Sequence, residues 1–144
     1  MSASTDFRAG STTTATSDSL VLLFARLAIV PLYLYSGVGK VMTFGATAGR
    51  LNGWLDGFGS SLAAGAIAVE LGGGVALLLG LFARQAAVVL ILFTIAATLM
   101  FHNFWAAPEA QAVQQTIHFL KNLGLIGALA LLAHRGAGKY ALGS

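Results

Sequence analysis

Three charged residues lie inside long apolar stretches of the sequence, where an ionised side chain needs a compensating partner. Glu70 lies between AIAV and LGGG, Arg26 lies in LVLLFARLAIV, and Lys121 lies in TIHFLKNLGLIGALALL. An unpaired charge inside a membrane costs from about 3 to more than 10 kcal/mol, and such residues often mark a functional site. We therefore predict that Arg26 pairs with Glu70, that Lys121 reaches toward the same carboxylate, and that these three residues carry the chemistry.

Other polar side chains recur at helical spacing and could bind a ligand. The first, third and fourth apolar runs carry lines of such residues: Arg26, Tyr33 and Lys40; Thr94, Thr98 and His102; Gln111, Gln115, His118 and Asn122. Residues spaced by three, four or seven share one face of a helix, so each line faces one way. We predict that the lines converge inside the protein, and that a bound molecule contacts Tyr33, Lys40, Thr98, His102, His118 and Asn122.

The elements that must position these residues follow from the composition. Of the 144 residues, 57% are hydrophobic and only 9% are charged, with a mean hydropathy of +0.82. A water-soluble domain carries about a quarter charged residues, whereas about 20 apolar residues in a row cross a membrane as a helix. Four runs meet this length, at about 20–39, 61–81, 85–102 and 112–133. We predict an all-α integral membrane protein with lipid around it, a four-helix bundle of antiparallel up-down topology.

The parts outside the apolar runs suggest a boundary and an orientation. Residues 1–19 are rich in Ser and Thr, so we predict a disordered tail, followed by one domain over residues 20–142. Lys40 to Ser60 forms the longest connection and a tight turn lies around Phe82–Arg84. More basic residues fall on the side of the termini (Arg8, Arg84, Arg135 and Lys139) than on the other (Lys40 and Arg50). This predicts a multi-pass protein of the cell membrane with both termini in the cytoplasm.

The residue types also exclude several classes of function. The chain has no cysteine, which rules out thiol–disulfide chemistry, iron–sulfur ligation and thiolate-bound zinc within it. Its basic residues are scattered, so we expect no nucleic-acid partner. Glu70, His102 and His118 could form a metal set of two histidines and one carboxylate, but their depths in the membrane differ. We therefore predict no metal site and no covalently bound cofactor.

Five segments in order resemble the DoxX family: RLAIVPLYLYSGVGK, VELGGGVALLLGLFAR, FHNFW, FLKNLGLIGALALL and GAGKYAL. The resemblance covers about residues 20–142 and implies a small four-helix membrane protein. Some members of the family are subunits of a thiosulfate:quinone oxidoreductase, and others occur in membrane assemblies with superoxide dismutase and a sulfurtransferase. The residues that match the family by position are Arg26, Ser36, Gly37, Lys40, Glu70, Gly73, Arg84, His102, Lys121 and Asn122.

Three functions are compatible with these observations. The leading hypothesis is a quinone-associated subunit of a membrane oxidoreductase complex, with hydrogen-bond donors from Tyr33, Thr98, His102, His118 or Lys121 and with Glu70 as the proton acceptor. Electrons would come from a soluble redox enzyme or a small reductant. The alternatives are a non-enzymatic membrane anchor or assembly factor for soluble redox enzymes, and transport of a small anion or other solute. A homo-oligomer is compatible with all three.

Overall fold

The protein folds into helices in the part of the chain that the structure, a computed structural model, describes. It describes residues 6–143, and the side chains of residues 16–143. The elements are α1 (Asp6–Met42), α2 (Phe44–Asn52), α3 (Gly59–Leu79), α4 (Ala83–Phe101), the short 3₁₀ helix η1 (Phe104–Ala106) and α5 (Glu109–Arg135). Four stretches are long and apolar enough to cross a membrane: Thr16–Met42, Gly59–Leu79, Ala83–Ala106 and Glu109–Arg135. The prediction of an all-α membrane fold with four spans is confirmed.

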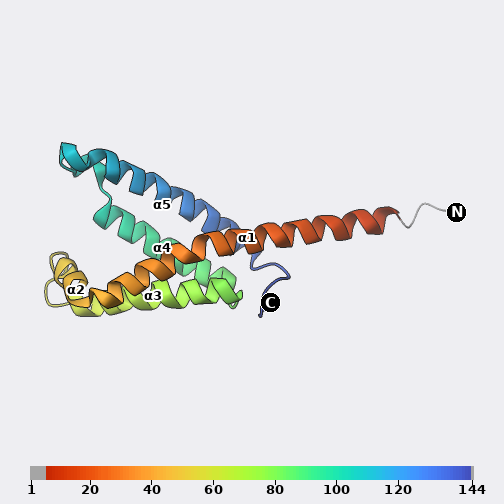
Figure 1. Ribbon diagram of the computed structural model, residues 1–144, viewed down its shortest axis with the longest axis horizontal. Coiled ribbons are helices and arrows are strands. Elements are labelled where there is room, and N and C mark those ends of the chain that lie inside the picture. The colour runs from red at the N-terminus through yellow and green to blue at the C-terminus, as the bar shows by residue number, and fades with distance from the viewer. Residues whose placement is uncertain (1–5, 144) are drawn as a thin grey trace.

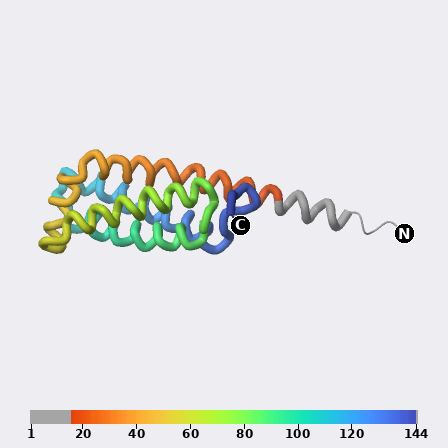
Figure 2. The backbone as a smooth tube through the Cα atoms, turned by 90° about the horizontal axis from the view of Figure 1, so that it is seen from below, coloured from red at the N-terminus to blue at the C-terminus, as the bar shows by residue number. Residues whose placement is uncertain are grey.

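The long helices form two pairs, α1 with α3 and α4 with α5, which meet near the C-terminal segment and diverge toward the end that carries α2 (Figures 1 and 2). Helix α1 packs mainly on α3, and α4 packs mainly on α5, with α3 and α4 also in contact. Which side of the membrane holds the termini stays a prediction from the basic residues. The shared core of buried apolar side chains includes Leu22, Ile29, Val30, Tyr33, Leu77, Leu90, Leu129 and Leu132.

Helix α1 begins earlier than the sequence predicted. It starts at Asp6, inside the segment expected to be a disordered tail, while residues 1–5 of that segment lie outside the described residues. Adding residues to an existing helix is much easier than nucleating a new one. The apolar span therefore provides a helix end from which the polar residues before Leu20 continue.

Two of the three consecutive glycines in α3 let neighbouring helices approach closely. A Cβ added at Gly73 would lie 2.9 Å from Leu90 Cδ2 on α4, and one at Gly74 would lie 2.9 Å from Leu34 Cδ2 on α1. Gly72 has open space instead. Small residues recur at every fourth position of α3 in a stripe through Gly72 (Ala64, Ala68, Gly72, Ala76 and Gly80), but Ala64, Ala68 and Gly72 are exposed. Small residues support close helix contacts in membranes, yet several residues of this helix are small, so size alone does not single out the contact face.

The connection between the first two spans contains the additional helix α2. Leu51 on α2 is buried, and the side-chain oxygen of Asn52 accepts a hydrogen bond from the backbone N–H of Gly59 at 2.8 Å. This bond satisfies one of the free N–H groups at the start of α3. The expected loop from Lys40 to Ser60 is thus an ordered cap at one end of the bundle.

Candidate functional site

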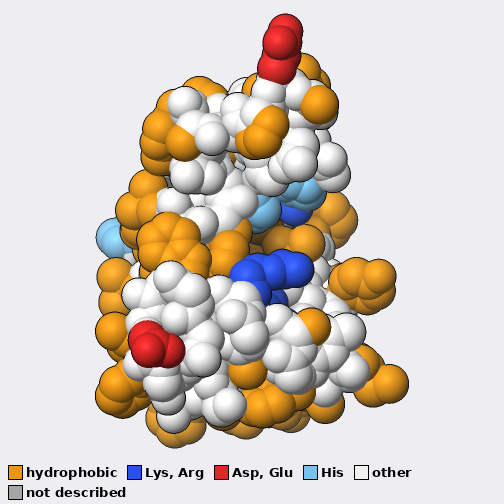
Figure 3. Space-filling view, turned by 90° about the vertical axis from the view of Figure 1, so that its left-hand side faces the viewer, with side chains coloured by type: hydrophobic (Ala, Val, Ile, Leu, Met, Phe, Trp, Pro, Cys, Tyr) orange, Lys and Arg blue, Asp and Glu red, His pale blue; other side chains and the backbone are white. Residues whose placement is uncertain are grey.

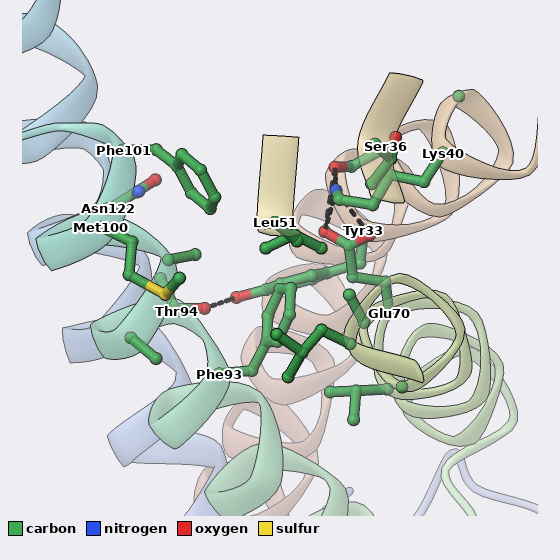
Figure 4. Close-up of a pocket in the computed structure, with 18 of the residues that line it drawn as sticks. Tyr33, Ser36, Lys40, Leu51, Glu70, Phe93, Thr94, Met100, Phe101 and Asn122 are labelled. Carbon is green, nitrogen blue, oxygen red and sulfur yellow. Dashed lines mark hydrogen bonds and ion pairs between the residues drawn. The ribbon is translucent and has the colours of Figure 1, made fainter. Parts of the chain in front are cut away.

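The buried carboxylate of Glu70 pairs with Lys40. Only 4% of the Glu70 side chain is exposed, and Lys40 Nζ lies 2.9 Å from its Oε1 and 2.8 Å from its Oε2. Ser36 Oγ donates a third hydrogen bond to Oε1 at 2.9 Å, and Lys40 Nζ donates to Ser36 Oγ at 2.7 Å. The three side chains form one cluster between α1 and α3 (Figure 4). The prediction that Glu70 faces protein and has a cationic partner is therefore correct, but the partner differs.

The local sequence of α1 explains why Lys40 can reach the acid. Ser36 and Lys40 are four residues apart, and helical side chains lean toward the N-terminus, so Lys40 extends back over Ser36. Between them lies Gly37, where an added Cβ would lie 2.6 Å from Leu71 Cδ2 and 3.3 Å from Glu70 Cβ. The missing side chain brings α1 close enough to α3 for the ion pair to form.

Arg26 binds main-chain carbonyls instead of Glu70. Its side chain is fully buried, and Nη1 donates to Leu77 O at 3.0 Å and to Leu78 O at 3.4 Å, while Nη2 donates to Tyr140 O. Arg26 Nε has no partner among the described residues. The guanidinium thus satisfies carbonyls in the last turn of α3, where a cation is favourable, and attaches the C-terminal segment.

The predicted Arg26–Glu70 pair is therefore wrong, and the reason is helix register. The contact of Gly37 with Glu70 shows which level of α1 faces the acid. Arg26 lies eleven residues earlier on the same helix, about 16 Å away along its axis at 1.5 Å per residue. An arginine side chain does not span that distance.

A line of hydroxyl and amide groups crosses the bundle from α1 to α5. Asn122 Nδ2 donates to Thr98 Oγ1 at 2.9 Å, and Thr98 Oγ1 donates to the carbonyl of Thr94 at 2.6 Å. Thr94 Oγ1 donates to Leu90 O at 2.7 Å, so its only proton is used. The 2.6 Å contact between Tyr33 and Thr94 must then be donated by the Tyr33 hydroxyl. The hydroxyl protons of Tyr33 and Thr98 are thus both used within the protein, on Thr94 Oγ1 and on the carbonyl of Thr94.

Two histidines and a lysine meet where α4 and α5 lie together. The rings of His102 and His118 stack with centroids 4.9 Å apart, and His102 Nδ1 lies 2.9 Å from Gln115 Oε1. Lys121 Nζ lies 3.3 Å from His118 Nδ1. Among the described residues, the hydrogen bonds of Glu70 come from Lys40 and Ser36, so the predicted contact of Lys121 with Glu70 is wrong. The ammonium group belongs to the histidine pair instead.

A cavity of about 840 Å³ brings most of these residues to one surface. Of the predicted site residues, Tyr33, Lys40, Glu70, His102, Lys121 and Asn122 line it. Thr98 and His118 do not line it but contact Asn122 and Lys121, whereas Arg26 is held elsewhere. Figure 4 shows Tyr33, Glu70 and Lys40 on one wall, with Thr94, Met100 and Asn122 across from them.

The rest of the lining is mostly apolar or small, and includes Leu51, Leu62, Phe93, Met100, Phe101 and Leu125. No group of three or more His, Cys, Asp or Glu side chains suited to a metal ion occurs in the part of the chain that the structure describes. The chemistry of this lining favours an organic molecule with a large apolar surface and a few polar atoms.

Sequence reasoning missed Ser36 as a site residue except through the family resemblance, and it missed Arg50 altogether. Arg50 lies on α2 and lines the cavity together with Thr47 and Leu51. The spacing of these three residues, at i, i+3 and i+4, is typical of one face of a helix. That pattern was a signal that the expected loop contains a helix that closes over the site.

The comparison with known proteins agrees with this architecture. The model of the DoxX family matches residues 21–103, and the model of the SURF4 family matches residues 66–144. The chain is 29% identical over 123 residues to "Inner membrane protein YphA" of Escherichia coli strain K12, a match that covers 85% of this chain and 88% of that protein. It is 31% identical over 126 residues to "Inner membrane protein YqjF" of the same organism, with 87% and 91% covered. No solved structure matches the chain.

The family match and the four spans describe the same kind of molecule. The DoxX match covers more than half of the chain and includes Arg26, Lys40 and Glu70. Both relatives are named as inner membrane proteins and match over nearly their whole length. The chain is therefore a multi-pass membrane protein that belongs to the DoxX family.

Proposed function

We propose that the protein binds a lipid-soluble quinone in its central cavity and serves as the quinone-associated subunit of a membrane oxidoreductase complex. The observation that carries this proposal is the cavity of about 840 Å³ with apolar walls and a few polar groups among four membrane-spanning helices. Ligand cavities of about 300–1,000 Å³ with this kind of lining hold small organic molecules. A quinone is such a molecule, with a flat ring, an apolar tail and two carbonyl oxygens.

The polar groups on the cavity wall suit the two needs of a bound quinone ring. Its carbonyl oxygens need hydrogen-bond donors, and the ammonium group of Lys121 and the amide of Asn122 line the cavity. Reduction of a quinone to a quinol takes up two electrons and two protons. Glu70 lines the cavity beside Lys40 and Ser36, and in this proposal it would exchange a proton with the bound molecule. A redox partner, either a soluble enzyme or a small reductant, would supply the electrons.

The test fills the cavity without disturbing the helix packing. Gly65 lines the cavity, whereas Gly72, seven residues further along the same exposed face of α3, does not, and an added Cβ meets nothing within 4 Å at either position. Gly65→Leu therefore reduces the cavity volume, and Gly72→Leu is the matched control. Trp54 is the reporter because its ring packs 6.4 Å, edge to face, from Phe101, which lines the cavity.

We expect a water-soluble short-chain quinone to quench Trp54 fluorescence in detergent-solubilised protein that carries Trp105→Phe. Gly72→Leu should bind with unchanged affinity, and Gly65→Leu should bind at least tenfold more weakly while its melting temperature stays close to that of the parent. Equal quenching in all three proteins, or no saturable quenching in the parent, would contradict the proposal. In the second case the alternative of a membrane anchor would be favoured.

A further inference from the structure

The charges around the cavity do not cancel. Lys40 and Glu70 neutralise each other, and all three ammonium protons of Lys40 are accounted for by Ser36 and the two carboxylate oxygens. Two other cations, Arg50 and Lys121, line the same cavity. The ion pairs between described side chains are Lys40–Glu70 and Arg135–Asp18, so neither cation has a carboxylate partner among them.

These two cations come from different elements that face the same opening. Arg50 belongs to α2, and Lys121 belongs to α5. Figure 3 looks at this end of the molecule and shows Lys, Arg and His atoms gathered around a hollow, while the Asp and Glu atoms in view lie toward its margins. The hollow therefore presents a positive surface next to apolar walls.

The unused hydrogen-bond donors of this pair match an oxyanion. Lys121 directs one proton toward His118 Nδ1, so two ammonium protons remain. The side chain of Arg50 has no hydrogen-bond partner among the described residues, so all of its guanidinium N–H groups are available. A planar guanidinium and an ammonium group are the side chains that bind phosphate oxygens most effectively, and both of these cations are exposed to an incoming ligand.

We propose that Arg50 and Lys121 bind the phosphate group of an anionic membrane lipid at the mouth of the cavity. The apolar side chains that line the same cavity, including Leu51, Leu62 and Phe101, favour a phosphate that carries acyl chains over a free ion. Basic recesses between membrane helices are known to bind anionic lipid headgroups. The inference shares Lys121 with the proposed quinone site but does not need a bound quinone, because it rests on the free donors of Arg50 and Lys121.

The test measures lipid retention by the purified full-length protein. Native mass spectrometry counts phosphatidylglycerol and phosphatidylcholine that stay bound after detergent exchange, in the parent and in Arg50→Gln, Lys121→Gln and the double variant. Arg84→Gln is the matched control, because Arg84 is an exposed cation at the other end of α4. Near a membrane surface each Lys or Arg contributes enough for about a fivefold change in affinity, and so about thirtyfold for both.

We expect the parent and Arg84→Gln to prefer phosphatidylglycerol, each single variant to lose about fivefold, and the double variant to lose about thirtyfold, at unchanged melting temperatures. Equal retention of both lipids, or a loss in Arg84→Gln as large as in the double variant, would overturn the proposal. A second measurement adds inorganic phosphate to the purified protein. If phosphate binds and no phosphatidylglycerol is retained, the assignment to a lipid is wrong. Gly65→Leu should keep the preference for phosphatidylglycerol, so a failure of the lipid proposal can be distinguished from a failure of the quinone proposal.

Discussion

The replacement of Lys40 by methionine tests the ion pair on which the site depends. Glu70 receives three hydrogen bonds, and Lys40 donates two of them as well as the balancing charge. The Glu70 side chain is only 4% exposed and cannot turn to water. The loss of one partner of a buried ion pair costs about 3–5 kcal/mol, because the other charge is left uncompensated. Since 27% of the Lys40 side chain is exposed, we expect the lower end, about 3 kcal/mol.

A second substitution shows how much of this loss in stability comes from the uncompensated charge of Glu70. Glu70→Gln keeps the shape of the side chain and removes the charge. Lys40→Met combined with Glu70→Gln should therefore be more stable than Lys40→Met alone, by about 2 kcal/mol, as expected for coupled charged neighbours. The free energy of unfolding is measured by reversible unfolding in mixed micelles with increasing SDS, followed by circular dichroism.

The Lys40 and Glu70 variants form a double-mutant cycle, and a second cycle uses Arg26, the partner predicted from the sequence, in place of Lys40. Arg26 binds Leu77 O, Leu78 O and Tyr140 O and shares no partner with Glu70. Arg26→Met should thus destabilise the protein, but its effect should add to that of Glu70→Gln within about 0.5 kcal/mol. Additive effects in the Lys40 cycle, or equal coupling in the Arg26 cycle, would refute the reasoning about the ion pair.

Two further predictions concern helix contacts, both measured by the same unfolding assay. Gly37→Ala should destabilise the protein by about 1–3 kcal/mol, because its Cβ would lie 2.6 Å from Leu71 Cδ2. Gly72→Ala should be neutral or slightly stabilising, because an added Cβ there meets nothing within 4 Å. Equal effects of the two substitutions would contradict the close contact at Gly37. Asn122→Ala should cost about 0.6 kcal/mol, and at most about 1.7 kcal/mol, through loss of its bond to Thr98, since these are the mean and the maximum for polar contacts between membrane helices. No measurable loss of stability would contradict a contribution from this bond.

The spans and the environment of Glu70 were predictable because they depend on local properties. Hydropathy over about 20 residues identifies a membrane helix whatever its neighbours are, and the predicted runs agree with the helices to within a few residues except at the start of α1. The cost of an exposed carboxylate in lipid requires Glu70 to face protein. Periodicity also placed Tyr33 and Lys40 on one face, and both line the cavity.

The cavity itself was not predictable, since its walls come from five separate elements. Arg50 illustrates the difficulty. In the sequence it is one basic residue in a polar connection, and only the packing of α2 on α3 turns it toward the same opening as Lys121. A role that depends on the meeting of two distant segments leaves no periodic pattern within either of them.

The sequence by itself determined that the chain crosses a membrane four times and that its acid is enclosed by protein, because hydropathy and the cost of charge in lipid act on each segment separately. Only the tertiary structure decided that Lys40, and not Arg26, neutralises Glu70. The register between two helices is set by close contacts such as that of Gly37 with Leu71. A slip of one turn moves a side chain by about 5.4 Å, which is enough to exchange one ionic partner for another.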